Sequence, residues 1–420
     1  MKYNRYEIGP YNLHIINTDK FKKNVISVNF KEKVKKEDLT IRNLLSSILI
    51  KSTKKYPNER SMNIASEELY NIGYNSSNSI YGNYTIMSFE ITFLDTKYTS
   101  PDLVKESVEF LSEMLFNPNV TDNRFDEKNF ELAKDEIKLI IESVKESTQK
   151  LASQLLFENM DKKAPYAYMA DGYLEDLEQI DSKKLFDYYK KVMKSNSIDI
   201  FVIGNNLENI KQIIVDNFKI NTIKKPTSEH YLIHDKFRKR VKSVKQKEKI
   251  NQSVLKIGFK FDNLTEFERK YVLNIYNYIL SGGPDSKLFK NVREKNSLCY
   301  NIRSNISKIF NLMIITAGID AKNYKKTVSL IKKELKNMEI GDFTEEDINS
   351  AKAIYTSSVL SMQDSPYNLI GVYKAKEYLN LDTLEKRLEE IKKVDKEMIM
   401  KISKKIKMDT IFLLEGENND

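Results

Sequence analysis

The chain has 420 residues, of which 69 are Lys or Arg and 60 are Asp or Glu, giving a net charge of +9. This length exceeds one ordinary core, so at least two domains are expected, and the single cysteine, Cys299, excludes an intramolecular disulfide. The first residues lack the apolar stretch of a secretory signal, and no apolar run approaches the roughly 20 residues of a membrane span, so we expect a cytoplasmic protein without membrane insertion.

Hydrophobic periodicity in the first half predicts strands and amphipathic helices. The expected strands are Tyr11–Asn17, Val25–Phe30 and Ile198–Gly204, together with a hairpin over Ser79–Leu94 that turns at Gly82 and Asn83. The expected helices are Asp38–Thr53, Ser61–Ile72, Asp102–Phe116, a long helix from Arg124 past Leu156, and Ser182–Lys194.

The second half repeats this plan. The expected elements are strands Ser253–Phe261, Leu298–Ser307 and Leu312–Asp320, helices Thr265–Leu280, Lys322–Met338 and Glu345–Met362, and a short helix around Leu288. Each half closes with a helix that starts at an aspartate, Asp181 or Asp395, and leads into an apolar strand that stops at glycine. We therefore predict an α+β fold of two homologous domains, each a mostly antiparallel sheet covered by helices. The alternative, that the two endings share a common helix-to-strand pattern by chance, is less favoured because the order of elements also matches.

The polar stretch 224–249 separates the two predicted domains, 1–223 and 250–420. Its basic run, Lys236 to Lys249, has Phe237 as its only aromatic residue and no nucleic-acid motif around it. We interpret the stretch as an exposed linker about which the domains open and close, and expect no nucleic-acid binding.

The stretch Ser281 to Ser304, SGGPDSKLFKNVREKNSLCYNIRS, carries a family resemblance. It resembles the glycine-rich loop and the following helix-to-strand element in the C-terminal domains of the insulinase and pitrilysin clan of zinc metallopeptidases, which includes mitochondrial processing peptidase. The matching positions are Gly282, Gly283, Ser286, Leu288, Phe289, the run Val292 to Lys295, Leu298 and Tyr300. The resemblance implies a duplicated metallopeptidase-like fold over nearly the whole chain.

Active members of that family bind zinc through His-x-x-Glu-His on a helix and through a Glu on a later helix. Matching Lys51-Ser52-Thr53 to the family's Lys-Gly-Thr places Asn43, Ser46 and Ser47 on the first three functional positions. Glu136 falls on the third-ligand position, and Asn129 falls where the family often has a second Glu. An amide and two hydroxyls bind zinc weakly, so the resemblance implies a degenerate site and no metal cofactor in this chain.

The remaining candidate ligands and nucleophiles do not suggest a replacement site. His230 and His234 have helical ligand spacing but lack the inner Glu and lie in the linker, so chance spacing is the preferred interpretation. His14 is expected to be a half-buried strand residue. Cys299 has no neighbouring His and should point away from Tyr300 by strand alternation.

Arg293 and Tyr300 match the Arg/Tyr pair that the family presents to substrate bound at the zinc. The resemblance implies that both donate hydrogen bonds to the peptide near the scissile carbonyl, with Gly282, Gly283 and Ser286 binding substrate. A guanidinium gives a fixed fork of donors, and a phenol donates without ionising near neutral pH. Without the resemblance, the residues would favour an Arg in a helix-end salt bridge with Glu294 or another acid and a Tyr packed in a strand.

Some members of the family are heterodimers in which one chain carries the zinc and its partner lacks it. We therefore predict a non-catalytic subunit that pairs with a homologous zinc-bearing peptidase subunit, binds an extended peptide at a sheet edge and supplies Arg293 and Tyr300 in trans. The zinc is expected in the partner, and a homodimer is possible when the chain is expressed alone. The alternatives are a purely structural homologue and a stand-alone peptide-binding or RNA-associated protein.

Overall fold

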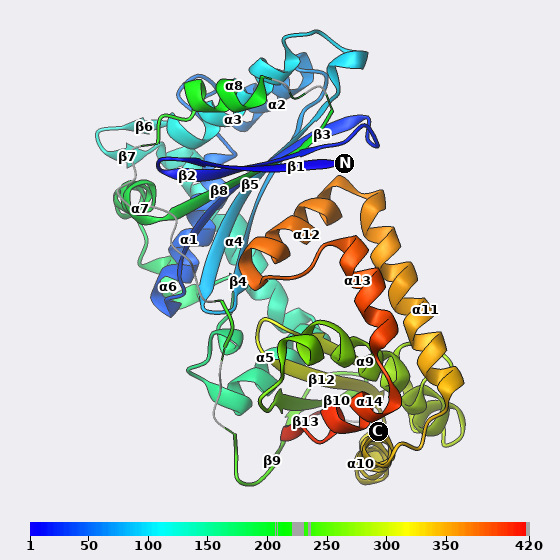
Figure 1. The fold of residues 1–420 in the computed structure, drawn as a ribbon. Helices are drawn as coiled ribbons and strands as arrows, with labels where there is room; N and C mark the ends of the chain where they lie inside the picture. Colours follow the sequence, from blue (N-terminus) through cyan, green and yellow to red (C-terminus); the bar gives the residue numbers. More distant parts are fainter. Residues whose placement is uncertain (206, 208, 221–230, 234–236, 417–420) are drawn as a thin grey trace. The chain divides into compact units, whose positions relative to one another are not determined.

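The computed structural model describes residues 1–205, 207, 209–220, 231–233 and 237–416, which fall into two compact units (Figure 1). Unit 1 is Met1–Ser143, Met169–His230 and Ser365–Gly371, and unit 2 is Val144–Tyr168, Tyr231–Asp364 and Val372–Asp420, as far as these ranges are described. Across the described ranges, no helix has the length and apolar character needed to cross a membrane.

Unit 1 is built on a six-stranded sheet in the order β1-β2-β8-β3-β5-β4. Its strands are β1 (Lys2–Ile8), β2 (Tyr11–Asn17), β3 (Lys23–Lys33), β4 (Gly73–Tyr81), β5 (Tyr84–Leu94) and β8 (Ser197–Gly204). Its helices are α1 (Leu39–Leu49), α2 (Glu59–Glu68), α3 (Leu103–Phe116), α4 (Glu127–Glu146), α6 (Leu174–Glu178), α7 (Ser182–Ser195) and α8 (Ile210–Asn217). A two-stranded hairpin, β6 (Val120–Thr121) and β7 (Arg124–Phe125), precedes α4.

Strand alternation divides the central strands of unit 1 into two faces. Leu13, Val28 and Ile200 point to one face and join the core formed with the helices. The intervening residues point to the other face, where they form a buried polar cluster around Asp199 of β8.

The carboxylate of Asp199 lies 2.6 Å from Lys31 Nζ, accepts a hydrogen bond from Asn12 Nδ2 at 2.9 Å and lies 3.7 Å from His14 Nε2. Burial alone would raise the pKa of Asp199, but Lys31 and His14 together hold that pKa below its ordinary value. His14 lies on β2 and stacks on Phe201 with ring centroids 4.2 Å apart. It is on a strand, as predicted, but it is fully buried rather than half-buried.

Unit 2 is built on a five-stranded sheet in the order β11-β12-β10-β13-β9. Its strands are β9 (Lys242–Glu248), β10 (Ser253–Phe261), β11 (Cys299–Ser307), β12 (Leu312–Ile319) and β13 (Ile406–Gly416). Its α-helices are α5 (Thr148–Asp161), α9 (Leu273–Ser281), α10 (Tyr324–Ile340), α11 (Glu345–Ser361), α13 (Leu384–Glu390) and α14 (Lys396–Ser403), and two π-helical segments are η4 (Glu268–Val272) and η5 (Phe289–Glu294). Helix α12 (Pro366–Leu379) contributes to both units.

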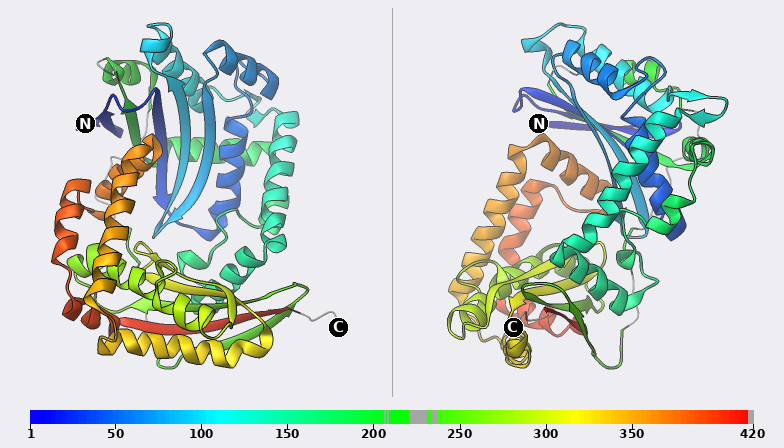
Figure 2. Two further views of the ribbon diagram at one scale, coloured as in Figure 1. Left: turned by 90° about the vertical axis from the view of Figure 1, so that its right-hand side faces the viewer. Right: turned by 180° about the vertical axis from the view of Figure 1, so that it is seen from behind.

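Helix α5 packs against β10 and β13 on one face of this sheet, whereas α9, α10 and α14 pack together on the other (Figure 2). Gly258 of β10 permits the close approach of α5, because a Cβ atom there would lie 2.3 Å from Met160 Sδ. The α5 face therefore depends on a small residue in the middle of a buried strand.

The two sheets share one topology, which confirms the predicted duplication. In both, the last strand of the repeat (β8 or β13) pairs in parallel with one strand (β2 or β9) and antiparallel with the next (β3 or β10). The order β2-β8-β3-β5-β4 thus corresponds to β9-β13-β10-β12-β11. Asp181 and Asp395 cap their helices as predicted, accepting hydrogen bonds from Lys184 N at 2.7 Å and Met398 N at 2.8 Å.

The prediction of one long helix from Arg124 past Leu156 is wrong. The chain forms α4 and α5, and Ser147 between them has an extended backbone and accepts a hydrogen bond from Lys150 N at 3.4 Å as the N-cap of α5. The chain passes from unit 1 to unit 2 close to this break, at residue 144 in the last turn of α4. Helix α5 therefore belongs to unit 2, although it lies in the first half of the sequence.

The predicted boundary at 249 also differs from the compact units, and the predicted boundary at 223 lies outside the described residues. The stretch interpreted as a linker contains β9, which pairs with β13 from Lys242↔Thr410 to Glu248↔Gly416. Strand β9 is the topological equivalent of β2, so the second repeat begins inside the basic run. In addition, segment 144–168 of the first half belongs to unit 2, and segment 365–371 of the second half belongs to unit 1.

Candidate functional site

Asn43 holds a neighbouring loop against α1. Its Nδ2 donates to the carbonyl oxygens of Leu39 at 3.1 Å and Ala170 at 2.5 Å. The same loop is fixed a second time where Tyr173 N donates to Thr40 Oγ1 at 2.9 Å. At the position of the family's first imidazole ligand, the side chain therefore has a structural role in unit 1.

Ser46 and Ser47 are also engaged in hydrogen bonds. Ser46 Oγ donates to Asn43 O at 2.8 Å and accepts from Asn78 Nδ2 of β4 at 2.5 Å. Ser47 Oγ donates to Glu136 Oε2 of α4 at 2.8 Å. The structure thus brings together Ser47 and Glu136, the positions of the second imidazole and the third ligand.

Lys51 completes this constellation. Its Nζ lies 3.0 Å from Glu136 Oε2, the same oxygen that accepts from Ser47. Sequence reasoning used Lys51 only to fix the alignment and gave Glu136 no partner. The spacing of four residues between Ser47 and Lys51 was the available signal, because the predicted helix Asp38–Thr53 would place both side chains on one face. In the structure α1 ends at Leu49, and Lys51 follows it in a turn.

The residues at this site do not fit zinc. Zinc sites in proteins use thiolates, imidazoles and carboxylates, whereas this site offers an amide, two hydroxyls and one carboxylate paired with an ammonium. In the described ranges, no group of three or more His, Cys, Asp or Glu side chains is arranged to hold a metal. His230 and His234 lie outside the described residues.

Asn129, at the position of the family's frequent second Glu, belongs to the start of α4. Its Nδ2 donates to Pro57 O at 3.0 Å and to Asp126 Oδ1 at 2.8 Å, and its backbone N donates to the same oxygen at 3.0 Å. The side chain is buried and stabilises the beginning of the helix.

Restoring the family's His-x-x-Glu-His at positions 43, 46 and 47 is expected to create a metal site. We expect the triple variant Asn43→His/Ser46→Glu/Ser47→His to retain about one zinc per chain after dialysis, because Glu136 already lies beside position 47. The natural chain should retain none under the same conditions. Metal content by plasma mass spectrometry measures both.

The matched control is Asn43→His/Ser46→Glu/Ser47→Ala, which lacks the second imidazole and should lose most of the bound zinc. A natural chain that holds one zinc tightly and loses it on Glu136→Gln would contradict the prediction.

The glycine-rich loop lines a cavity of about 340 Å³ in unit 2, between the end of α9 and the start of α11. Gly282 packs tightly, since a Cβ there would lie 2.6 Å from the Tyr278 backbone, whereas Gly283 needs glycine for its φ of +158°. Ser286 is buried and its Oγ donates to Gly283 O at 2.6 Å, so it shapes the loop. The three predicted substrate-binding residues therefore border one cavity.

Arg293 and Tyr300 lie on either side of a tight turn after η5. Ser297 has a positive φ of 51°, and its N donates to Arg293 O at 2.9 Å. The Arg293 guanidinium is exposed and lies 4.4 Å from the centre of the Phe289 ring. Neither residue is among those that line the cavity beside the glycine-rich loop.

Tyr300 occupies a β-bulge at the start of the edge strand β11. The β11–β12 register passes from Cys299↔Ile319 to Asn301↔Gly318, which leaves Tyr300 without a cross-strand partner. Its side chain is 69% exposed, and in the described part of the chain no hydrogen bond or ion pair engages its hydroxyl. The bulge turns the phenol outward, at the end of the turn that begins at Arg293.

Cys299 points inward, opposite to Tyr300, as predicted from alternation. Its thiol is buried, and burial raises its pKa to about 11 although Arg293 opposes this shift. A thiol with such a pKa stays protonated near neutral pH and is a poor nucleophile.

Comparison with known proteins finds relatives of similar sequence and fold. A family model described as "Peptidase M16 inactive domain" matches residues 179–355. The chain is 28% identical over 414 residues to the "Probable inactive metalloprotease YmfF" of Bacillus subtilis (strain 168), a match that covers 97% of this chain and 96% of that protein. It is 24% identical over 257 residues to the "Non-peptidase homolog YmxG" of Helicobacter pylori, covering 60% of this chain and 57% of that protein.

Solved structures agree with this result. A conserved protein from Enterococcus faecalis V583 is similar with a TM-score of 0.91 and 26% identity, covering 99% of this chain and 100% of that chain. The M16 inactive domain protein from Pseudomonas fluorescens shares the fold with a TM-score of 0.80 at 15% identity, covering 99% and 98%. The resemblance carried by Ser281 to Ser304 is thus confirmed, and the chain is similar in sequence and fold to M16-like proteins that are described as inactive.

Proposed function

We propose that this chain is the non-catalytic subunit of a heterodimeric processing peptidase. It pairs with a homologous subunit that carries zinc, binds an extended peptide substrate and supplies Arg293 and Tyr300 to the partner's active site. The exposed donor pair is the observation that supports this proposal: Tyr300 projects from a bulge, Arg293 is exposed, and among the described residues no hydrogen bond or ion pair engages the polar atoms of either side chain.

The chemistry of the pair suits the role. Arg293 offers a permanent positive charge with several donors, and Tyr300 offers a neutral donor, so both can stabilise an oxyanion that develops on a peptide carbonyl. The cavity beside Gly282 and Gly283 adds exposed backbone at the end of α9, where an extended peptide can approach closely. In unit 1, the ligand positions hold Asn43, Ser46 and Ser47, so the reacting zinc must come from another chain.

The test is reconstitution with a homologue from the same organism that has an intact His-x-x-Glu-His. The two chains should elute as a 1:1 complex in size-exclusion chromatography with light scattering, and the complex should cleave peptides faster than either chain alone. Complex formation without any gain in activity would leave this subunit a purely structural homologue and overturn the catalytic part of the proposal.

A further inference from the structure

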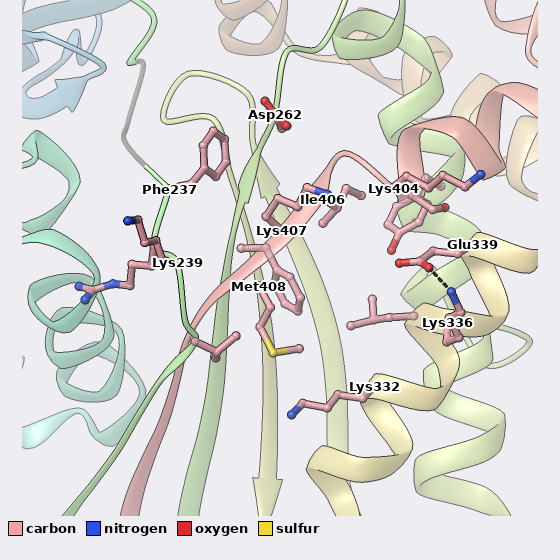
Figure 3. A pocket seen from close by; sticks show the side chains of 16 residues that line it. Phe237, Lys239, Asp262, Lys332, Lys336, Glu339, Lys404, Ile406, Lys407 and Met408 are labelled. Carbon is pink, nitrogen blue, oxygen red and sulfur yellow. Dashed lines mark hydrogen bonds and ion pairs between the residues drawn. The ribbon is translucent and has the colours of Figure 1, made fainter.

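A pocket of about 640 Å³ opens in unit 2 beside α10 and the first residues of β13 (Figure 3). Lys332 and Lys336 of α10 border one side, and Phe237 and Lys239 border the other, with β13 between them. The floor includes Phe259, Tyr276 and Met408, so the pocket has an apolar base. Its size is within the range of small-ligand and peptide sites.

The rim of this pocket is strongly basic. Six basic side chains line it, namely Arg238, Lys239, Lys332, Lys336, Lys404 and Lys407, against the two acidic residues Asp262 and Glu339. Glu339 is already paired with Lys336 at 2.7 Å. An excess of positive charge over an apolar base favours a ligand that combines negative charges with apolar groups.

The pocket also contains an open strand edge. The ladder between β9 and β13 begins at Lys242↔Thr410, whereas β13 itself starts four residues earlier at Ile406. On its other side, β13 is paired with β10 down to Phe261↔Ile406. The β10–β13 register skips Asp409, which forms a bulge, so, among the described residues, 406–408 are paired with β10 on one side and with no strand on the other. A further strand can pair with that side.

The segment opposite this edge is held by contacts to α5. Arg238 donates to Met160 O at 2.6 Å and to Asn159 O at 2.8 Å, and its Nε lies 3.3 Å from Asp409 Oδ1. Lys242 Nζ donates to Asn159 Oδ1 at 2.7 Å. These contacts fix the segment to α5 and to Asp409 of β13, so the wall of the pocket is preformed.

We propose that this pocket binds an extended acidic peptide in which Asp or Glu alternates with apolar residues, as an added strand along 406–408. The cations come from three separate stretches of chain and surround an apolar base, which fits charges distributed along a peptide. A compact anion such as a phosphate prefers donors that converge on one point. Phe237 and Val241, each 44% exposed, provide apolar surface for the peptide's side chains.

The experiment uses the full chain and a fluorescein-labelled heptapeptide in which Asp alternates with Leu and Phe. We expect saturable binding by fluorescence anisotropy that is about tenfold weaker for Lys332→Glu/Lys407→Glu and for a peptide with Asn in place of Asp. Lys333→Glu is the matched control, because Lys333 is exposed on the same helix but does not line the pocket. It should leave the affinity unchanged.

Two further peptides, N-methylated at either the odd or the even residues, test the added strand. Only one set of amides can face β13, so one peptide should bind and the other should not. Equal binding of the parent peptide by the natural chain, the double variant and Lys333→Glu would overturn the proposal. Displacement of the peptide by inorganic tripolyphosphate at comparable concentration would assign the pocket to a compact anion and overturn the peptide assignment. None of these substitutions touches Arg293 or Tyr300, so the result is independent of the proposed function.

Discussion

In the reconstituted complex, Arg293→Ala is expected to lower kcat/KM for peptide cleavage by about a hundredfold or more without preventing assembly. The reason is that a preorganised donor aimed at a developing oxyanion contributes about 2.7 to 4 kcal/mol to the transition state. Arg293 makes no ion pair in the described part of the chain, so its removal should leave the fold intact. Initial rates across substrate concentrations, together with light scattering of the complex, measure both outcomes.

Tyr300→Phe removes a single hydroxyl from an exposed side chain and should lower the same rate, with its effect mainly in kcat if the phenol donates only in the transition state. The matched control is Lys295→Ala, since Lys295 is an exposed cation in the same turn as Arg293. A loss of kcat/KM of similar size on Lys295→Ala would indicate that the positive charge of this turn attracts the peptide in a general way, without a specific role for Arg293. An active complex indifferent to both Arg293→Ala and Tyr300→Phe would show that this subunit contributes only shape.

The fold was predictable where burial leaves a clear period in the sequence. Strands β2 and β10 have the predicted bounds, and the hairpin of β4 and β5 turns at Gly82 with φ of +62°, as its Gly-Asn pair indicated. The match of the two repeat endings, from Asp181 and from Asp395, correctly predicted that the second half repeats the first.

The two outer strands β1 and β9 escaped prediction because charged and amide residues interrupt the apolar alternation in both, although Tyr6, Ile8 and Val244 pack against the cores. Strand β9 reads KSVKQKE, in which four of the seven residues are charged, and it lies at the edge of its sheet. Edge strands commonly carry lysine because it discourages unwanted pairing with other chains. The same feature that protects the edge removes the apolar alternation that identifies a strand, so the start of the second repeat was interpreted as a linker.

The site was predictable only as far as alignment reaches. The contact between Ser47 and Glu136 agrees with the positions assigned from the family's motif. The bulge that exposes Tyr300 is a property of strand pairing, as is the unpaired start of β13, and neither leaves a local signal in the sequence. Both features depend on where the pairing between two strands begins, which only the structure shows.

The second large effect concerns stability. Asp199→Ala is expected to lower the free energy of unfolding by about 3 to 5 kcal/mol at pH 7, because it removes the carboxylate that lies 2.6 Å from the buried ammonium of Lys31. The substitution also leaves the buried Asn12 amide without the carboxylate oxygen that accepts its hydrogen bond. Urea denaturation followed by circular dichroism measures the change. The matched control is Asp187→Ala, whose partner Lys190 lies at 2.8 Å on the exposed face of α7, and there the loss should stay within about 1 kcal/mol.

The pH dependence separates the ion pair from simple packing. Because the pKa of Asp199 is lower in the folded protein than in the unfolded chain, its charge stabilises the fold above the ordinary carboxylate pKa of about 3.9. That contribution is lost as the pH falls from about 4 toward the lowered pKa of the folded state, where the folded carboxylate also takes up its proton. The difference in stability between the natural chain and Asp199→Asn should therefore be constant near neutral pH and should narrow below about pH 4. A difference that stays the same down to pH 3 would mean that shape and hydrogen bonding at position 199, rather than its charge, stabilise this face of the sheet.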